Sequence, residues 1–383
     1  MHARGPEGEP ARLREVARVF LKLGVIGFGG PAAHVALMRR EMVEQRRWVD
    51  EDRFLQLFGA SSLIPGPSST ELGMMLGYER AGWPGLLVAG VCFITPAMTI
   101  VLTLAWAYVR FGHLPQTGWI LYGVGPVMLA IIADALWQLG RRALRSWLLV
   151  VVAAVVLAGY VAGIGVVTLL LGGACIVTVA RNIRRLRGAA NLFLPSLPLL
   201  SLTSTTDVSP TSLFLEFLKL GAVAFGSGYV LVAFLRADLV ERLGWLTQRQ
   251  LVDAVSIGQV TPGPVFTTAT FIGYVAGGPR GAILATAGIF FPAFVFAGLV
   301  YMLLPRLQRS PWTAAFIDGV TVSALALMAG VTIQLGRIVY VDVATVVLSV
   351  VSFAVLRRSQ LNSAWLVVAG AVIGLILRGF GIT

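Results

Sequence analysis

Charged residues are scarce in this chain of 383 residues: they make up 13% of it, against 57% hydrophobic residues and a mean hydropathy of +0.83. A soluble domain carries about 25% charged residues, which argues against a soluble enzyme, a nucleic-acid-binding protein or a disordered protein. Apolar stretches long enough to cross a hydrocarbon layer of roughly 30 Å recur along the whole chain. The composition therefore predicts an all-α polytopic membrane protein embedded in the lipid bilayer.

Cysteine and histidine are rare as well. Cys92 and Cys175 lie within apolar runs and the three histidines are far apart, so we expect no disulfide framework and no metal site. No nucleophile–base pair and no nucleotide-binding loop stands out. We therefore predict no cofactor, no catalytic residue and no enzymatic activity. A membrane-embedded reductase or lipid transferase is the enzyme alternative, and it lacks any such constellation here.

The formal net charge of +12 comes from 28 arginines and only two lysines, against 18 acidic residues. The arginines collect in short loops between apolar segments, as the positive-inside rule describes for membrane proteins. We therefore do not expect nucleic acid as a partner. An anionic cargo is compatible with this charge but is not required by it.

An internal repeat decides the predicted architecture. FLKLG at 20–24 returns at 217–221, and with this offset of 197 the columns from 20 to 71 match at 17 of 52 positions. At an offset of 196, the columns from 77 to 141 match at 19 of 65 positions. The chain therefore consists of two homologous halves. We divide it into a polar tail at 1–16 without a cleaved signal peptide, a first repeat at 17–187, a linker at 188–212 and a second repeat at 213–383.

Each half divides into six apolar segments that we expect to be helical. They run at about 17–38, 54–77, 85–110, 119–140, 146–160 and 163–180, and again at about 214–235, 250–274, 282–304, 316–336, 342–356 and 361–377. Gly and Pro interrupt the first two segments of each half, as in GFGGP at 27–31 and PGP at 65–67. Interruptions at membrane depth are tolerated where the backbone faces protein or a wet cavity. Matching interruptions in two halves indicate a transport site.

The loop arginines indicate that the two halves insert in opposite orientations. Loops 141–145 and 181–187 carry seven arginines, whereas their counterparts in the second half keep two. The arginine-poor loops of the first half gain four in the second, namely Arg306, Arg309, Arg357 and Arg358. Because the bias changes sides, we predict inverted repeats with broken or re-entrant helices and leave the number of crossings open.

The two lysines are the sharpest single signal. Lys22 and Lys219 occupy the same column of the repeat, each inside an apolar run just before the glycine-rich interruption. A charged group within a membrane segment is costly and normally marks a pathway or a partner. The alternative is that both side chains snorkel to a nearby interface, since each lies a few residues from the start of its segment.

The PGP motifs predict an anion site. Proline suits the first position of a helix, so we expect half-helices to begin after Pro67 and Pro264. The amides of 68–70 and 265–267, with the positive end of each helix dipole, then bind an anion without dedicated side chains. The predicted substrate-binding set joins these motifs to the glycine-rich interruptions and the lysines: Lys22, Gly29, Gly30, Pro65, Gly66, Pro67, Ser68, Ser69, Thr70, Lys219, Gly226, Ser227, Pro262, Gly263, Pro264 and Thr267. A plain Pro-Gly turn and close helix packing by small residues are the structural alternatives.

Four carboxylates lie in or beside apolar segments. A buried acid can carry protons for coupling, and we select Glu71 and Asp134 as the candidates. Asp253 and Asp318 lie near segment starts, which favours capping or solvated positions. We expect the charged stretch at 39–53 to be a solvated loop, and 247–250 to form a capping box that starts the next helix.

The motifs FLKLGVIGFGGP, WVD and LIPGPSSTELGMMLGY, followed by FLKLGAVAFGSG and GQVTPGPVFTTATFIGY, resemble the chromate ion transporter (CHR) family. The resemblance covers residues 17 to about 378 and matches the long-chain, two-domain members. It implies a location in the inner membrane of a bacterium or archaeon. It also implies export of chromate, a tetrahedral dianion similar to sulfate.

The residues and the resemblance together predict a secondary transporter that holds an oxyanion between two inverted halves and works by alternating access. Lys22 and Lys219 would lend positive charge to this site. A transporter of another anion such as sulfate, and a passive anion channel, are the alternatives. A homodimer is compatible with the sequence.

Overall fold

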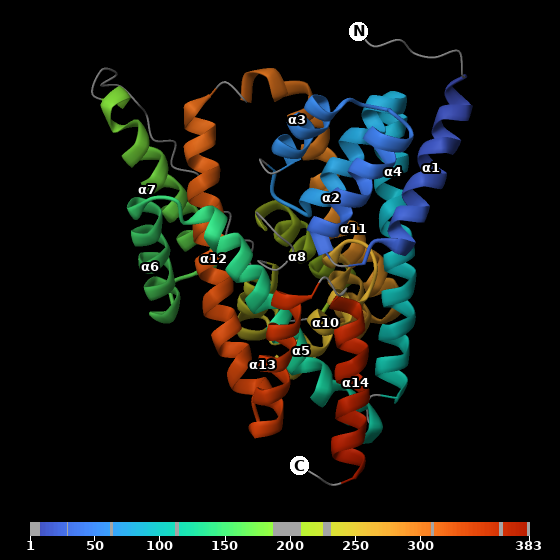
Figure 1. Cartoon of the computed structure of the whole chain (residues 1–383), viewed down its shortest axis with the longest axis vertical. Coiled ribbons are helices and arrows are strands. Elements are labelled where there is room, and N and C mark those ends of the chain that lie inside the picture. Colours follow the sequence, from blue (N-terminus) through green and yellow to red (C-terminus); the bar gives the residue numbers. More distant parts are fainter. Residues whose placement is uncertain are drawn as a thin grey trace.

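The computed structural model describes residues 8–28, 30–61, 64–111, 115–186, 208–224, 231–307, 310–359 and 363–380. Every regular element within these ranges is a helix, which confirms the predicted fold class (Figure 1). Gly29, Gly226, Ser227 and most of the predicted linker lie outside the described residues.

The two halves contain matching helices in the same order. The first half comprises α1 (Glu9–Ile26), α2 (Gly30–Arg39), the π-helix η1 (Arg40–Gln45), α3 (Glu51–Ser61), α4 (Ser68–Phe111), α5 (Pro115–Ala143), α6 (Trp147–Val161) and α7 (Val166–Leu186). The second half comprises α8 (Pro210–Val223), α9 (Leu231–Leu235), the π-helix η2 (Arg236–Arg242), α10 (Gln248–Val260), the 3₁₀-helix η3 (Val265–Thr267), α11 (Thr268–Leu307), α12 (Pro311–Val339), α13 (Val343–Arg358) and α14 (Ser363–Gly379). Helix α12 begins and ends 196 residues after α5, which is the offset of the sequence repeat.

Helices α4 and α11 each consist of two helices joined at a sharp kink. The kink lies at Ala81 and Gly82 in α4, and at Gly277 and Gly278 in α11. Gly82 has a φ of 65° and Gly278 a φ of 63°, which is backbone geometry that favours glycine. Each kink separates a short first part, which follows the PGP motif, from a long apolar second part.

The first two predicted segments of each half are helical hairpins. Lys22 of α1 meets Glu41 of η1, and Glu15 meets Arg46, so α1 runs antiparallel to α2 and η1. Arg53 of α3 meets Glu79, near the end of the first part of α4, so this pair is antiparallel as well. The glycine-rich interruption and the PGP motif form the tips of these two hairpins. The second half repeats both of them.

The equivalent long helices of the two halves run in opposite directions. Trp83 of α4 lies against Gly298 of α11, and Gly90 lies against Phe294, so residue numbers rise along one helix as they fall along the other. In Figure 1, α7 ends at the upper end of the molecule and its counterpart α14 ends at the lower end. Two equivalent helices that pack antiparallel are related by an axis perpendicular to them, which is the geometry of inverted repeats.

The last helices of each half pack on the other half. Helix α5 packs against α13 and α14, whereas α12 packs against α6 and α7. Gly123 of α5 lies against Gly370 and Gly374 of α14, with backbone close to backbone, as small residues permit in membrane helices. These contacts between helices of opposite halves add to the contact between α4 and α11.

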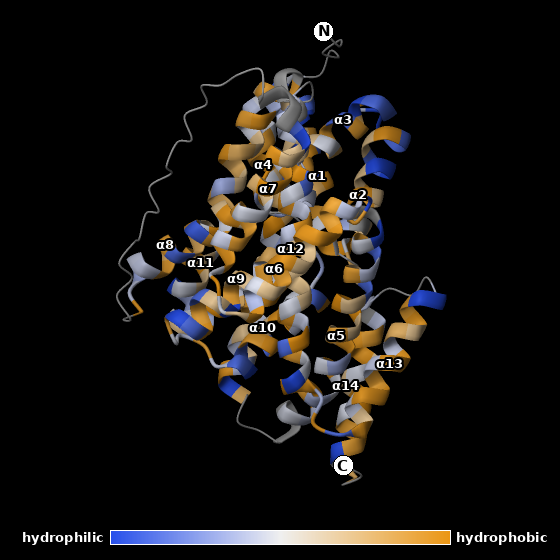
Figure 2. Cartoon of the chain, turned by 90° about the vertical axis from the view of Figure 1, so that its left-hand side faces the viewer, coloured by the Kyte–Doolittle hydropathy of each residue, from blue (hydrophilic) through white to orange (hydrophobic). Residues whose placement is uncertain are grey.

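Four helical stretches are long and apolar enough to cross a membrane: Ser68–Phe111, Gly118–Arg141, Val265–Leu304 and Trp312–Val339. Helices α6, α7 and α14 contribute shorter apolar stretches. Large hydrophobic side chains stand exposed on the outside, including Trp137, Trp147 and Trp365. Hydrophobic residues dominate the helices in Figure 2, whereas hydrophilic ones gather on α3 near the end that carries the N-terminus. The distribution supports a multi-pass membrane protein.

The structure corrects one local prediction and confirms another. Residues 40–45 of the charged stretch form η1 rather than a loop, and Glu41 is buried because Lys22 and Arg46 pair with it. The predicted capping box is present: the Thr247 amide donates to Gln250 Oε1 at 2.9 Å and the Gln250 amide donates to Thr247 Oγ1 at 3.1 Å.

Candidate functional site

Hairpin tips from both halves meet at the centre of the α4–α11 contact. The Gly66 amide donates to the Ala224 carbonyl at 2.8 Å, and the Gly263 amide donates to the Gly27 carbonyl at 2.9 Å. Gly263 is 197 residues after Gly66, and Ala224 is 197 residues after Gly27, so one bond occurs twice in mirrored positions. Each PGP tip is thereby bound to the glycine-rich tip of the opposite half.

The backbone requires glycine at the middle position of both PGP motifs. Gly66 has a φ of 133° and Gly263 a φ of 93°, values that other residues rarely adopt. A Cβ at Gly263 would lie 2.8 Å from the Cβ of Ala97. The PGP motif is therefore more than a Pro-Gly turn between helices, because it allows the two halves to touch backbone to backbone.

The PGP motifs open half-helices, as the sequence predicts. Helix α4 begins at Ser68, directly after Pro67, and η3 begins directly after Pro264 and leads into α11. The Thr70 amide donates to the Pro67 carbonyl at 2.7 Å, and the Thr267 amide donates to the Pro264 carbonyl at 3.0 Å. These two amides are therefore used inside the turn. They are not available to an anion in this conformation.

The tips are closed to solvent. Pro65, Gly66 and Pro67 are buried, as are Pro262, Gly263 and Pro264. Ser69, Thr70 and Thr267 are each exposed by 2% or less, whereas Ser68 is intermediate. The described residues of both tips are therefore closed to solvent in this structure.

Glu71 lies in the first turn of α4 and is 0% exposed. Among the described residues, neither of its carboxyl oxygens has a hydrogen-bond partner, and neither does the Thr70 hydroxyl. The carboxyl group folds back over the PGP tip, since a Cβ built on Gly66 would collide with Glu71 Oε1. A buried carboxyl group without donors is costly in its charged form. Glu71 therefore lies at the tip, and its role in proton coupling stays a prediction.

His34 is a member of the site that the sequence did not reveal. Its Nε2 donates to the Gly27 carbonyl at 2.8 Å, which also accepts the amide of Gly263. Its Nδ1 lies 3.0 Å from Ser69 Oγ, and its ring packs edge-on against Phe93. His34 therefore links the glycine-rich tip to the start of α4. In the sequence it is one of three scattered histidines.

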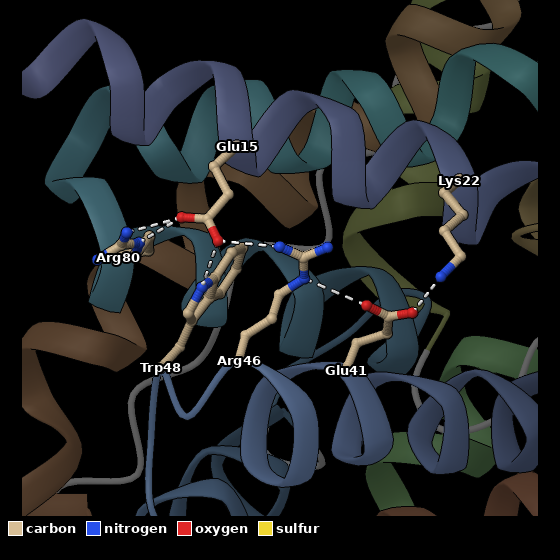
Figure 3. A network of polar contacts seen from close by, with 6 residues as sticks. All are labelled: Glu15, Lys22, Glu41, Arg46, Trp48 and Arg80. Atoms are coloured by element: carbon tan, nitrogen blue, oxygen red, sulfur yellow. Dashed lines mark hydrogen bonds and ion pairs between the residues drawn. The ribbon is translucent and has the colours of Figure 1, made fainter. Parts of the chain in front are cut away.

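Lys22 lies beside the site, on the flank of the first hairpin. Its ammonium group pairs with Glu41, which also accepts from Arg46 at 3.2 Å (Figure 3). Arg46 pairs in turn with Glu15 at 3.0 Å, and Glu15 holds Arg80 of α4 at 2.7 Å. The network joins α1, η1 and the end of the first part of α4. Its acids compensate the Lys22 charge.

Lys219 makes the same contact in the second half. It pairs with Asp238 at 2.9 Å, in the column of Glu41, and also with Glu216 at 2.6 Å. Arg242 binds both of these acids, at 2.6 Å and 2.9 Å. The pair between α1 and η1 is thus duplicated between α8 and η2, and in both halves it fixes the first hairpin. The partner of each lysine is thus an acid of its own half, and a role of the lysines in anion binding stays a prediction.

The other carboxylates lie away from the tips. Asp134 of α5 accepts from Gln138 at 2.6 Å and lies 3.7 Å from Arg357. Asp318 is half-exposed and pairs with Arg181, as expected of a solvated acid. Asp253 differs from the prediction: it is buried inside α10 and accepts from Tyr108 at 2.8 Å, because α4 of the opposite half covers it.

Comparison with known proteins gives a single family. The family model described as chromate transporter matches residues 14–178 and again residues 211–375. The chain is 35% identical over 378 residues to the chromate transport protein of Cupriavidus metallidurans, covering 95% of this chain and 93% of that protein. It is 33% identical over 374 residues to the probable chromate transport protein of Synechococcus elongatus, covering 95% of each. No solved structure matches the chain.

Proposed function

The chain belongs to the chromate transporter family, and from this premise we propose that it is a secondary transporter that exports chromate across the cell inner membrane. The relatives named chromate transport proteins match it over nearly their whole length, which supports a related cargo. Sulfate has the same tetrahedral shape and double charge and is the natural competitor.

The proposed site for the dianion lies between the hairpin tips. Half-helices begin at the two tips, at Ser68 and after Pro264, so each tip carries the positive end of a helix dipole. The buried Thr70 hydroxyl lacks a partner within the part of the chain that the structure describes and is a donor for an oxyanion oxygen. Recognition by backbone amides and a hydroxyl suits a compact inorganic anion.

The mirrored bonds carry the proposed mechanism. Gly66 with Ala224 and Gly263 with Gly27 are two equivalent closures related by the inverted repeat. Two conformations in which one closure parts while the other holds would expose the tips alternately to the two sides of the membrane. The lysines support this cycle by holding the first hairpins rigid through their acids, rather than by touching the anion.

Flux into liposomes tests the proposal. We would reconstitute the purified protein and measure labelled chromate uptake against sulfate and phosphate, with and without a proton gradient. The proposal expects saturable, sulfate-sensitive flux that responds to the gradient. Flux that does not saturate and ignores the gradient would indicate a passive channel. No chromate flux from folded protein would remove chromate as the cargo.

Two variants serve as the negative and the positive control of this assay. Gly263→Ala disturbs one closure and is expected to be inactive, whereas Asp318→Asn changes a half-exposed ion pair on α12 and is expected to match the wild type. Right-side-out and inverted vesicles then report the direction of transport.

A further inference from the structure

The two PGP tips differ at one acidic position. Glu71 follows the first motif by four residues, and Thr268 stands in its column after the second. The Thr268 hydroxyl donates to the Val265 carbonyl at 2.8 Å and is satisfied. Both oxygens of Glu71 are buried without a hydrogen-bond partner among the described residues. The site therefore carries one acid without a hydrogen-bond partner among the described residues, and this acid belongs to the first half.

The Glu71 carboxyl group lies where the proposed anion would lie. It is in the first turn of α4 and folds over Gly66, at the positive end of the half-helix. This end of a helix attracts negative charge, whether the charge belongs to a ligand or to a side chain. A carboxylate and a dianion cannot share the place, because like charges at short distance in a buried site repel strongly.

No ion pair to Glu71 is found among the described residues. The titratable residues on the elements packed against α4 include His34 on α2, Glu15 and Lys22 on α1, Arg53 on α3, Arg249 and Asp253 on α10, and Tyr274, Arg280 and Tyr301 on α11. Lys22 and Glu15 are held by their own partners, and Arg53 pairs with Glu79 at the far end of α3. Helix α11 meets the tip through Ala293, and His34 bonds to Ser69 and Gly27.

We infer that the Glu71 carboxyl group belongs to the first-half anion subsite and that the dianion binds there only while this group is protonated and neutral. This inference rests on the proposed function, and it assigns the proton coupling to one residue of one half. Where Glu71 is ionised before binding, it takes one proton from water as the dianion binds, so that binding adds two negative charges and removes one.

Protonation of Glu71 determines how the affinity for the anion changes with pH. Anion affinity is full when Glu71 is protonated and is lost as pH rises through the pKa of Glu71, by up to tenfold per pH unit. Glu71→Gln keeps the shape of the neutral acid and does not titrate. Its affinity should therefore equal the low-pH limit of the wild type at every pH.

Chromate binding to the full-length protein in detergent, titrated at several pH values, tests this. The ratio of Kd between wild type and Glu71→Gln is the readout, because the protonation of chromate itself and of His34 affects both proteins alike. We expect a ratio near one at low pH that rises about tenfold per pH unit above the titration of Glu71. Asp318→Asn, which removes a carboxylate from α12, should follow the wild type.

Two results would overturn the inference alone. One is a constant ratio across the pH range with clear binding in both proteins, and the other is a folded Glu71→Gln variant that no longer binds. Absence of binding in every protein at every pH would overturn the proposed function together with the inference.

A measurement on the wild type covers the case in which the variant does not fold. Chromate added to the protein in weakly buffered solution, at a pH above the titration of Glu71, should cause uptake of close to one proton per bound anion, after subtraction of a protein-free blank. Binding without proton uptake would contradict the inference.

Discussion

The two PGP tips share one backbone arrangement and differ in their side chains. Gly66 and Gly263 both adopt positive φ and both donate to the opposite half. The first tip is surrounded by His34, Ser69 and Glu71, whereas Leu231, Phe266 and Thr268 fill the same columns around the second. The duplicated part of the site is therefore backbone, and the part that occurs once is polar and titratable.

This difference separates two tasks. In the proposed cycle, an alternating opening needs two equivalent closures, which agrees with closing residues that occur in both halves. In the proposed coupling, one titratable group for each bound anion is enough, which agrees with an acid that occurs in one half. The predictions below test this division, beginning with the change expected to have the largest effect.

Replacing either Gly66 or Gly263, the middle glycine of each PGP motif, should stop transport. Gly263→Ala combines backbone strain with a contact to Ala97, so we expect about 3 kcal/mol of destabilisation. Gly66→Ala meets only the flexible end of Glu71, so about 2 kcal/mol is expected. Thermal unfolding in detergent and chromate flux in liposomes measure the two effects. Normal flux in either folded variant would mean that the closures are not part of the cycle.

Copying the second tip onto the first should remove the pH dependence. In Glu71→Thr, the affinity for chromate should lose the dependence on pH that Glu71 confers, which reaches about tenfold per pH unit. Thr268→Val is the matched change at the other tip and should keep the wild-type pH profile. Flux measured between pH 6 and 8 compares them. A change of profile in Thr268→Val, and none in Glu71→Thr, would reverse the assignment.

The duplicated lysine pairs should differ in strength. Lys219→Met leaves two largely buried acids to Arg242 alone and should cost about 2 kcal/mol. Lys22 is half-exposed and Arg46 also holds Glu41, so Lys22→Met should cost below about 1 kcal/mol. Thermal unfolding compares the two variants. If Lys22→Met stayed folded and lost all flux, the lysine would belong to the anion site after all.

Asp134→Asn should have the smallest effect. Its carboxylate accepts from Gln138, and an amide oxygen at the same place accepts the same bond. The distant pair with Arg357 contributes below about 1 kcal/mol. The pH profile of flux should stay as in the wild type, and a flattened profile would make Asp134 a second proton carrier.

The repeat was the part of the architecture that sequence could predict well. Two halves, interrupted helices, opposite orientation and half-helices after each PGP motif all follow from identities at a fixed offset and from the loop arginines. These features are local or periodic. They do not depend on which side chains meet across the fold.

The sequence did not predict contacts between distant residues, because these depend on which side chains meet in the folded chain. Glu41 lies in a stretch with equal numbers of Arg and acids, which is typical of a solvated loop, and only the hairpin brings it to Lys22. Asp253 lies near the start of its segment, but Tyr108 from the other half buries it. The turns that use the Thr70 and Thr267 amides, and the bonds of His34, likewise require the folded backbone.

Locating the bound anion tests the central claim most directly. Chromium scatters X-rays anomalously, so crystals grown with chromate and measured at the chromium absorption edge would mark its position. The account predicts a single strong peak between Gly66 and Gly263, beside the first turns of α4 and η3. A peak next to Lys22 or Lys219, with none at the tips, would contradict it.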